Sequence, residues 1–172
     1  MNVLDTSFIN LSAPYMVWKE DERRYCFETD QGGLFQITFD LEQSIWLDGA
    51  YELGIQNIKH VASPRDLKLK KTIIAVVEEF FRQNPGILLY ICETGDGRQA
   101  QRSRLFLSWF KEYQDLYVIK SVRIQSEGID NYASIIVQQN NPALQQIIAD
   151  FESMVHDLTF QKPKEEWEWI EG

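Results

Sequence analysis

The stretch that decides the fold begins with Ile87-Leu-Leu-Tyr-Ile-Cys92, six apolar residues without polar alternation. Such a run is typical of a strand that is covered on both faces of its sheet. It continues into a loop, Glu93-Thr-Gly-Asp-Gly-Arg-Gln99, and then into Ala100-Gln-Arg-Ser-Arg-Leu-Phe-Leu-Ser-Trp-Phe110, whose apolar residues have helical spacing. We therefore predict a central buried strand, a glycine loop and a helix, an order in which α/β proteins often place a site.

The residues before this stretch alternate as strands do. Apolar and polar residues alternate over 25–28 and 35–39 around the turn Asp30-Gln-Gly-Gly33, and again over 51–56. This pattern predicts an antiparallel meander. The segment 15–18 is a further candidate strand, and 19–24 reads as a charged turn.

Helical periodicity follows the meander. Ser63 is the expected N-cap and Pro64 the first helical residue, and Asn84-Pro-Gly86 should stop this helix. A second helix should follow Gly97, with one side formed by Leu105, Phe106, Trp109, Phe110 and Tyr113. Strands are expected at 116–125 and 132–137, and a third helix should begin at Asn141-Pro142.

The predicted fold class is α+β, with a mixed, largely antiparallel sheet, a central buried strand at 87–92 and about three helices. Residues 1–162 form one predicted domain, and 163–172 form an acidic aromatic tail.

The formal net charge of -9 argues against nucleic acid and anionic membranes as default partners, although a local basic patch could override this average. The first residues lack a basic region and include Asp5, so we expect no signal peptide and a cytoplasmic protein. Cys26 and Cys92 stand among apolar residues and are expected to be buried free thiols.

The loop at 94–98 is the candidate ligand site, formed by Gly95, Asp96, Gly97, Arg98 and, one turn on, Arg102. Glycines let backbone N–H groups approach a ligand, and a helix start favours an anion. The two arginines are four residues apart and share a helical face. The alternative is structural: Asp96 caps the helix, the glycines shape the turn, and the arginines pair with Glu93 or Asp96.

Signatures of catalysis are missing from the sequence. It contains no nucleophile elbow, Walker loop or zincin motif. Of the two histidines, His60 has no partner at metal-ligand spacing, and His156 has only Glu152 and Asp157, which we assign to a charged helix face. The sequence therefore predicts no metal site and no cofactor.

The tail from Glu165 to Glu171 alternates Glu with Trp or Ile over much of its length, which is the pattern of an amphipathic strand. Trp167 and Trp169 are candidate partner-binding residues; alternatively, they fold back and cover the domain itself.

Two resemblances add to this interpretation. The motif Ile-Leu-Leu-Tyr-Ile-Cys-Glu-Thr-Gly-Asp-Gly-Arg-Gln-Ala, followed by Arg-Leu-Phe and Trp-Phe, resembles the signature of an uncharacterised family of small cytosolic bacterial proteins. Over 25–137, the order of meander, helix, strand, helix and hairpin resembles the Gcn5-related N-acetyltransferase fold. That resemblance implies a glycine-rich loop for the pyrophosphate of coenzyme A before the first helix. Here the matching segment, Gln56 to Asp66, contains no glycine, and its Pro64 and Asp66 oppose binding of an anion. Arg104 stands where that family often has a tyrosine acid.

Two classes of function follow. The first is a non-catalytic binding or protein-interaction domain whose partner is a protein or a small anionic ligand. The second is an acyltransferase-like enzyme with a degenerate acyl-CoA site.

Overall fold

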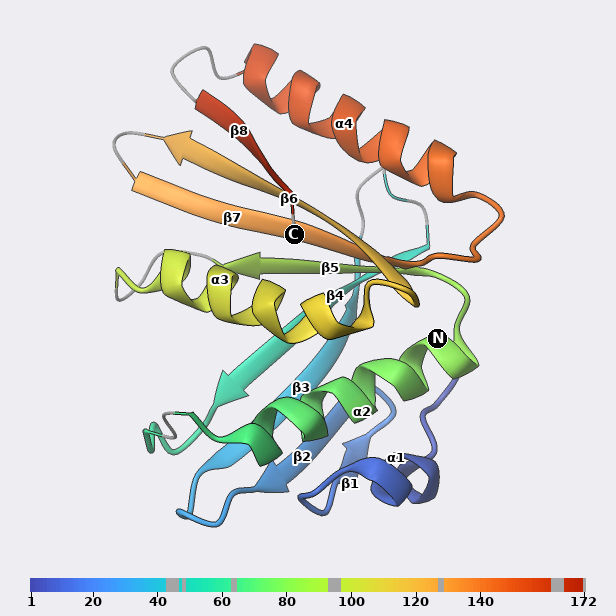
Figure 1. The fold of residues 1–172 in the computed structure, drawn as a ribbon, viewed down its shortest axis with the longest axis vertical. Helices are drawn as coiled ribbons and strands as arrows, with labels where there is room; N and C mark the ends of the chain where they lie inside the picture. The colour runs from blue at the N-terminus through green and yellow to red at the C-terminus, as the bar shows by residue number, and fades with distance from the viewer. Residues whose placement is uncertain are drawn as a thin grey trace. The chain divides into compact units, whose positions relative to one another are not determined.

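The computed structural model describes residues 1–42, 47, 49–62, 65–92, 97–126, 129–161 and 166–171. Its elements follow one another as shown in Figure 1: α1 (Thr6–Ser12), β1 (Trp18–Asp21), β2 (Arg24–Glu28), β3 (Leu34–Leu41), β4 (Ala50–Asn57), α2 (Leu67–Gln83), β5 (Ile87–Cys92), α3 (Gln99–Phe110), the short 3₁₀ helix η1 (Lys111–Tyr113), β6 (Tyr117–Ser126), β7 (Ile129–Gln138), α4 (Leu144–Gln161) and β8 (Glu166–Glu171). The α+β class is confirmed. The chain divides into an N-terminal unit, 1–40 with 53–85, and a C-terminal unit, 41–52 with 86–172.

The N-terminal unit contains the predicted hairpin. β2 pairs antiparallel with β3, and Cys26 stands opposite Gln36. Because side chains alternate along a strand, Phe35, Ile37 and Phe39 point to one face, and all three are buried. Phe39 stacks on Phe80 of α2 with 5.0 Å between ring centroids. The aromatic face of the hairpin is thus the core against which α2 packs.

The first helix, α1, was not predicted from the sequence. Asp5 is its N-cap, and its carboxylate accepts a hydrogen bond from the Ser7 N–H. The charged turn predicted at 19–24 is also shorter than expected, because Trp18–Asp21 forms β1 and pairs with β2. The proposed strand at 15–18 is wrong except for its last residue, at which β1 begins.

Helix α2 begins later than predicted. Its N-cap is Asp66, which accepts hydrogen bonds from the N–H groups of Lys68 and Leu69, so Ser63 is not the cap. Ser63 and Pro64 themselves lie outside the described residues. Asn84 ends the helix, as predicted, and its N–H donates to the Phe80 carbonyl. The prediction of Ser63 was wrong because serine and aspartate are both good N-cap residues, so that residue type alone does not distinguish Ser63 from Asp66.

In the C-terminal unit, the strand order from residues 50–52 of β4 is β4-β5-β7-β6-β8. β5 runs parallel to β4, with Ala50 opposite Ile87, and antiparallel to β7. Leu88 of β5 is fully buried and Leu89 is 4% exposed. The prediction of a central, buried strand is therefore confirmed.

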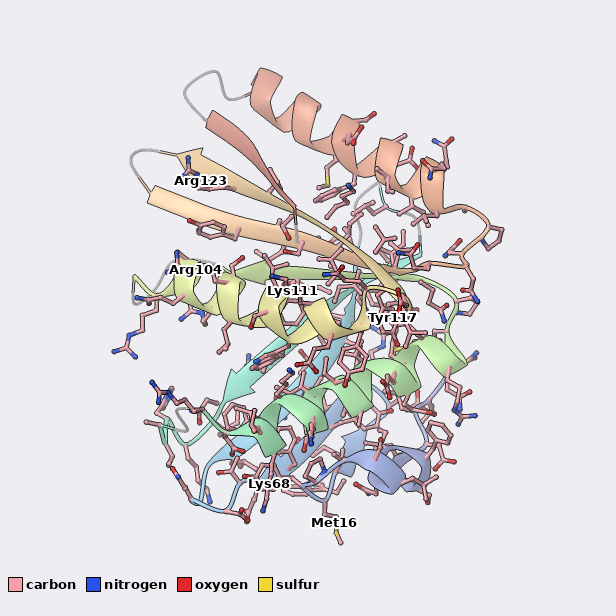
Figure 2. All side chains as sticks on the ribbon, viewed as in Figure 1. Met16, Lys68, Arg104, Lys111, Tyr117 and Arg123 are labelled. Carbon is pink, nitrogen blue, oxygen red and sulfur yellow. The ribbon has the colours of Figure 1, made fainter. Side chains whose placement is uncertain are left out.

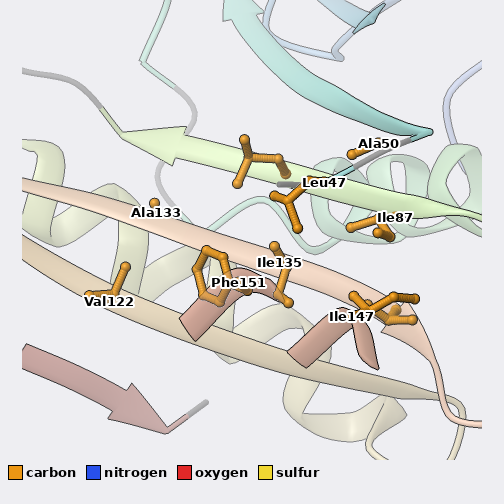
Figure 3. Close-up of a cluster of buried hydrophobic side chains, with 10 residues drawn as sticks. Leu47, Ala50, Ile87, Val122, Ala133, Ile135, Ile147 and Phe151 are labelled. Carbon is orange, nitrogen blue, oxygen red and sulfur yellow. The ribbon is translucent and has the colours of Figure 1, made fainter. Parts of the chain in front are cut away.

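Each face of this sheet carries a helix. On one face, α4 contributes Ile147 and Phe151 to a cluster of buried side chains from the sheet and the segment before it (Figure 3), whose other members are Leu47, Ala50, Ile87, Leu89, Val122, Ala133, Ile135 and Val137. On the other face, Phe106 of α3 stacks on Tyr90 with 3.9 Å between centroids. Phe110 is also buried, but Leu105, which the sequence groups with them on one side of the helix, is 53% exposed.

The tail residues 166–171 form the predicted strand. β8 pairs antiparallel with β6, and Trp167 stands opposite Ile124 and Trp169 opposite Val122. This pairing makes the segment part of the sheet of the C-terminal unit. The side chains of β8 are not among those that the structure describes.

Candidate functional site

The site predicted at the start of α3 is partly described. Gly97 has a φ of 72°, in the left-handed region that glycine adopts without steric cost. Arg98 occupies the N-cap position and makes no side-chain capping hydrogen bond, while its carbonyl accepts from the Arg102 N–H at 3.0 Å. The cap position therefore belongs to Arg98 and not to Asp96. Glu93, Gly95 and Asp96 lie outside the described residues.

Arg98 and Arg102 come together on one surface. Among the described residues, they line an open hollow of about 420 Å³ with Gln101 and Leu105. The four positions follow the steps i, i+3, i+4 and i+7, which define one face of a helix. Arg98 is exposed and Arg102 is half-buried. The shared helical face predicted for the two arginines is what the structure shows.

Gln101 and Leu105 were not predicted as part of this surface. The same helical spacing would have found them, because each lies three residues from one of the arginines. The apolar spacing groups Leu105 with Phe106 and Phe110, but only those two phenylalanines are buried. An amide and an exposed leucine therefore accompany the two guanidinium groups.

Arg104 does not line the hollow, although it is an exposed residue of the same helix. Figure 2 labels Arg104 and Lys111 along this helix, and Lys111 directly follows its last residue. From residue 97 to 111 the chain carries four cationic and no acidic side chains, within a protein whose net charge is -9. The local charge of α3 is thus opposite to the average and favours an anion.

Both arginines also take part in further interactions within the chain. The structural role proposed for them as an alternative therefore stays open beside the ligand-binding role. A ligand at this surface would have to exchange with, or add to, these internal interactions.

The start of α2 has a different chemistry. The Tyr15 hydroxyl donates to Asp66 Oδ2 at 2.6 Å, while Asp66 Oδ1 accepts from the first-turn N–H groups of Lys68 and Leu69. Burial, followed by the hydrogen bond to Asp66, raises the pKa of Tyr15 to about 12. The carboxylate thus occupies the place where a phosphate would meet the helix N-terminus.

The two cysteines were predicted to be buried free thiols. Cys26 is a buried free thiol, as predicted, and burial together with nearby Glu20 raises its pKa to about 11. The side chain of Cys92 is outside the described set.

In the described ranges, no group of three or more His, Cys, Asp or Glu side chains is arranged to hold a metal ion. In the same ranges, no helix has the length and apolar character needed to cross a bilayer.

Fold and site together define an α+β domain with a mixed, mostly antiparallel sheet and a basic helix, α3, on one face of its C-terminal unit. The chain belongs to DUF6169, a family of unknown function, whose model matches residues 65–153. The matched range extends from the residue before the α2 cap into α4 and includes β5 and α3. The prediction of an uncharacterised family is thereby confirmed. No curated protein and no solved structure matches the chain.

Proposed function

We propose that this protein is a non-catalytic, cytoplasmic binding domain that recognises a carboxylate- or phosphate-bearing partner on α3. The observation that carries the proposal is the hollow in which Arg98, Gln101, Arg102 and Leu105 meet. Its ligand is an acidic segment of a partner protein or a small anion.

The chemistry of the four side chains supports this class of ligand. A guanidinium group binds a carboxylate or phosphate through two parallel hydrogen bonds, which are stronger than hydrogen bonds between neutral groups. Gln101 adds one amide donor and one amide acceptor. Leu105 is 53% exposed and offers an apolar contact beside the charges. An acidic peptide that also carries apolar side chains would use all of these groups.

Calorimetry with inorganic phosphate and with a peptide of alternating Glu and Leu tests the proposal. We expect Arg98→Ala and Arg102→Ala each to weaken peptide binding by roughly tenfold, because a hydrogen bond to a charged group contributes about 1.5–3 kcal/mol. Arg104→Ala is the matched control, since it removes the same charge from the same helix outside the hollow. The control should bind as the unaltered protein does.

The melting temperature of the three variants separates the two roles of the arginines. If Arg98 and Arg102 serve only to hold the loop before α3, their replacement lowers the melting temperature and leaves peptide affinity unchanged. Equal losses of affinity in all three variants would indicate nonspecific attraction to a basic helix and would refute the proposed site.

The second candidate is an acyltransferase-like enzyme with a degenerate acyl-CoA site. The observation in its favour is the strand order, in which β4 is parallel to β5 and the β6–β7 hairpin pairs back onto β5. This order supports the candidate because the resemblance noted in the sequence implies a succession of meander, helix, strand, helix and hairpin.

The cap of α2 argues against productive binding of coenzyme A. Asp66 already accepts from the N–H groups of Lys68 and Leu69, and its negative charge would repel a pyrophosphate. We therefore expect no micromolar affinity for acetyl-CoA in calorimetry. A micromolar dissociation constant would favour the enzyme over the binding domain.

A further inference from the structure

A second surface in the N-terminal unit combines exposed apolar and basic side chains. We call it the α2 corner and define it by Met16, Arg65, Leu67, Lys68, Lys70 and Lys71. Leu67 is 69% exposed and Met16 is 78% exposed. Single exposed apolar residues are normal on protein surfaces, so the corner is of interest because of what surrounds these two.

Contacts of Tyr15 hold the segment before β1 against the start of α2. The Tyr15 N–H donates to Thr72 Oγ1 at 3.2 Å, and the Tyr15 hydroxyl donates to Asp66. Lys68 Nζ lies 5.7 Å from the centroid of the Tyr15 ring. Met16 is the next residue along the chain, and Figure 2 shows Met16 and Lys68 at the same end of this unit.

The charge of the corner is opposite to that of the whole chain. Residues 65–71 carry four cationic side chains and a single acid, Asp66, whose Oδ1 caps the helix and whose Oδ2 accepts from the Tyr15 hydroxyl. Lys68 forms an exposed ion pair with Asp30 at 2.7 Å. Leu67 and Lys71 are four residues apart, so the leucine lies on the same helical face as a lysine.

We propose that the α2 corner docks on an anionic membrane surface. Side chains that are more than two-thirds exposed protrude without surrounding walls, and a lipid interface accepts such side chains without a complementary pocket. Protein hot spots instead fill well-packed pockets on the partner. The basic side chains around Leu67 and Met16 would meet lipid phosphate and carboxylate groups at the same depth. The chain's average charge predicts no membrane partner, but attraction acts locally, within about a Debye length.

Vesicle flotation with the full chain tests this inference. One set of vesicles contains phosphatidylcholine mixed with phosphatidylserine, and the other contains phosphatidylcholine alone. We expect binding to the first set only, weakening as salt is raised. Lys71→Glu and Leu67→Ser should each lower the bound fraction by roughly tenfold, through charge and apolar contact respectively.

Two matched controls make these substitutions specific. Lys111→Glu makes the same change of charge and Leu116→Ser the same apolar change, both at exposed positions of the C-terminal unit. Both controls should bind vesicles as the unaltered protein does. Because all four positions are exposed, their melting temperatures should agree closely.

Three results would overturn the proposal: no binding to anionic vesicles, equal binding by Lys71→Glu and the unaltered chain, or a Leu67-dependent affinity for soluble polyglutamate without vesicle binding. The last result would assign the corner to an acidic protein. The α3 proposal is tested separately, because its variants, Arg98→Ala and Arg102→Ala, lie on another helix.

Discussion

Tyr15 and Asp66, 51 residues apart in the chain, share a 2.6 Å hydrogen bond in which the phenol donates to Oδ2 of the carboxylate. The other carboxylate oxygen, Oδ1, caps α2. One side chain therefore both starts the helix and fastens the segment between α1 and β1 onto it. This relationship explains why the start of α2 is already occupied by a negative charge.

Replacing Asp66 by Ala should lower the free energy of unfolding by about 1–2 kcal/mol, because both the cap and the bond to Tyr15 are lost. Urea denaturation measures the change. Asp30→Ala is the control, because it removes one carboxylate from an exposed ion pair with Lys68. It should lower the free energy of unfolding by less than about 1 kcal/mol. Equal losses would show that the cap contributes little.

Tyr15 also predicts a loss of stability at alkaline pH. Its pKa is raised to about 12 in the folded protein, above the ordinary value of roughly 10. The contribution of Tyr15 to the free energy of unfolding is therefore fully present below about pH 10. It is lost as the pH rises toward the pKa of Tyr15 in the folded protein. Tyr15→Phe should make the decline in melting temperature between these values shallower. An unchanged decline would assign it to other groups, such as Tyr25, whose pKa is also raised by burial.

Glu79 and Glu78 are adjacent on α2 and should respond to replacement in opposite ways. The Glu79 carboxylate is fully buried and accepts from Arg82 at 2.6 and 3.0 Å, from Gln83 and from the Asp5 N–H. Burial alone would raise the pKa of Glu79. The hydrogen bonds, of which those from Arg82 have the largest effect, outweigh burial, so that the pKa lies below the usual range. Burial raises the pKa of Glu78.

Glu79→Gln should therefore destabilise the protein at neutral pH, by about 2–3 kcal/mol, because Arg82 loses its partner. This contribution is present above the ordinary glutamate pKa of roughly 4.3 and disappears as the pH falls through the lower folded value. Glu78→Gln should raise stability slightly at neutral pH, since a raised pKa means that the charged form costs free energy in the fold. Thermal unfolding against pH distinguishes them, and parallel curves for the two variants would contradict these assignments.

Leu89→Ala should cost roughly 2–5 kcal/mol, because the side chain lies in the buried cluster beneath α4 and its removal leaves a cavity. Leu105→Ala removes the same atoms from a half-exposed position on α3 and should cost about 0.5 kcal/mol or less. Chemical denaturation of both variants gives the comparison. A small loss for Leu89→Ala would be inconsistent with a central β5.

Removing residues 163–172 should lower the melting temperature and promote self-association, since β6 would lose its partner β8 and present an open sheet edge. Light scattering detects the association.

The double variant Trp167→Ala, Trp169→Ala keeps the backbone of the strand and tests the proposed partner-binding role of these residues. A normal melting temperature with a weakened partner complex supports that role, whereas a lowered melting temperature without loss of binding contradicts it.

Local patterns in the sequence were sufficient for much of the fold. Alternation predicted β2 and β3, an unbroken apolar run predicted β5, and the four-residue spacing of Arg98 and Arg102 predicted their common face. These features depend on the geometry of one strand or one helix, so neighbouring residues contain the information. The short α1 was missed because its stability comes from contacts with α2, such as the Asp5 N–H on Glu79 and Phe8 beneath Arg82.

Only the tertiary structure decided the features that join distant parts of the chain. The parallel pairing of β4 with β5, the addition of β8 to β6, and the bond from Tyr15 to Asp66 all depend on which segments meet. Exposure is settled in the same way: Leu105 and Phe106 are adjacent and both apolar, yet one lies in the hollow and the other beneath the helix. Spacing tells which residues share a face, whereas packing against the sheet determines which face is buried.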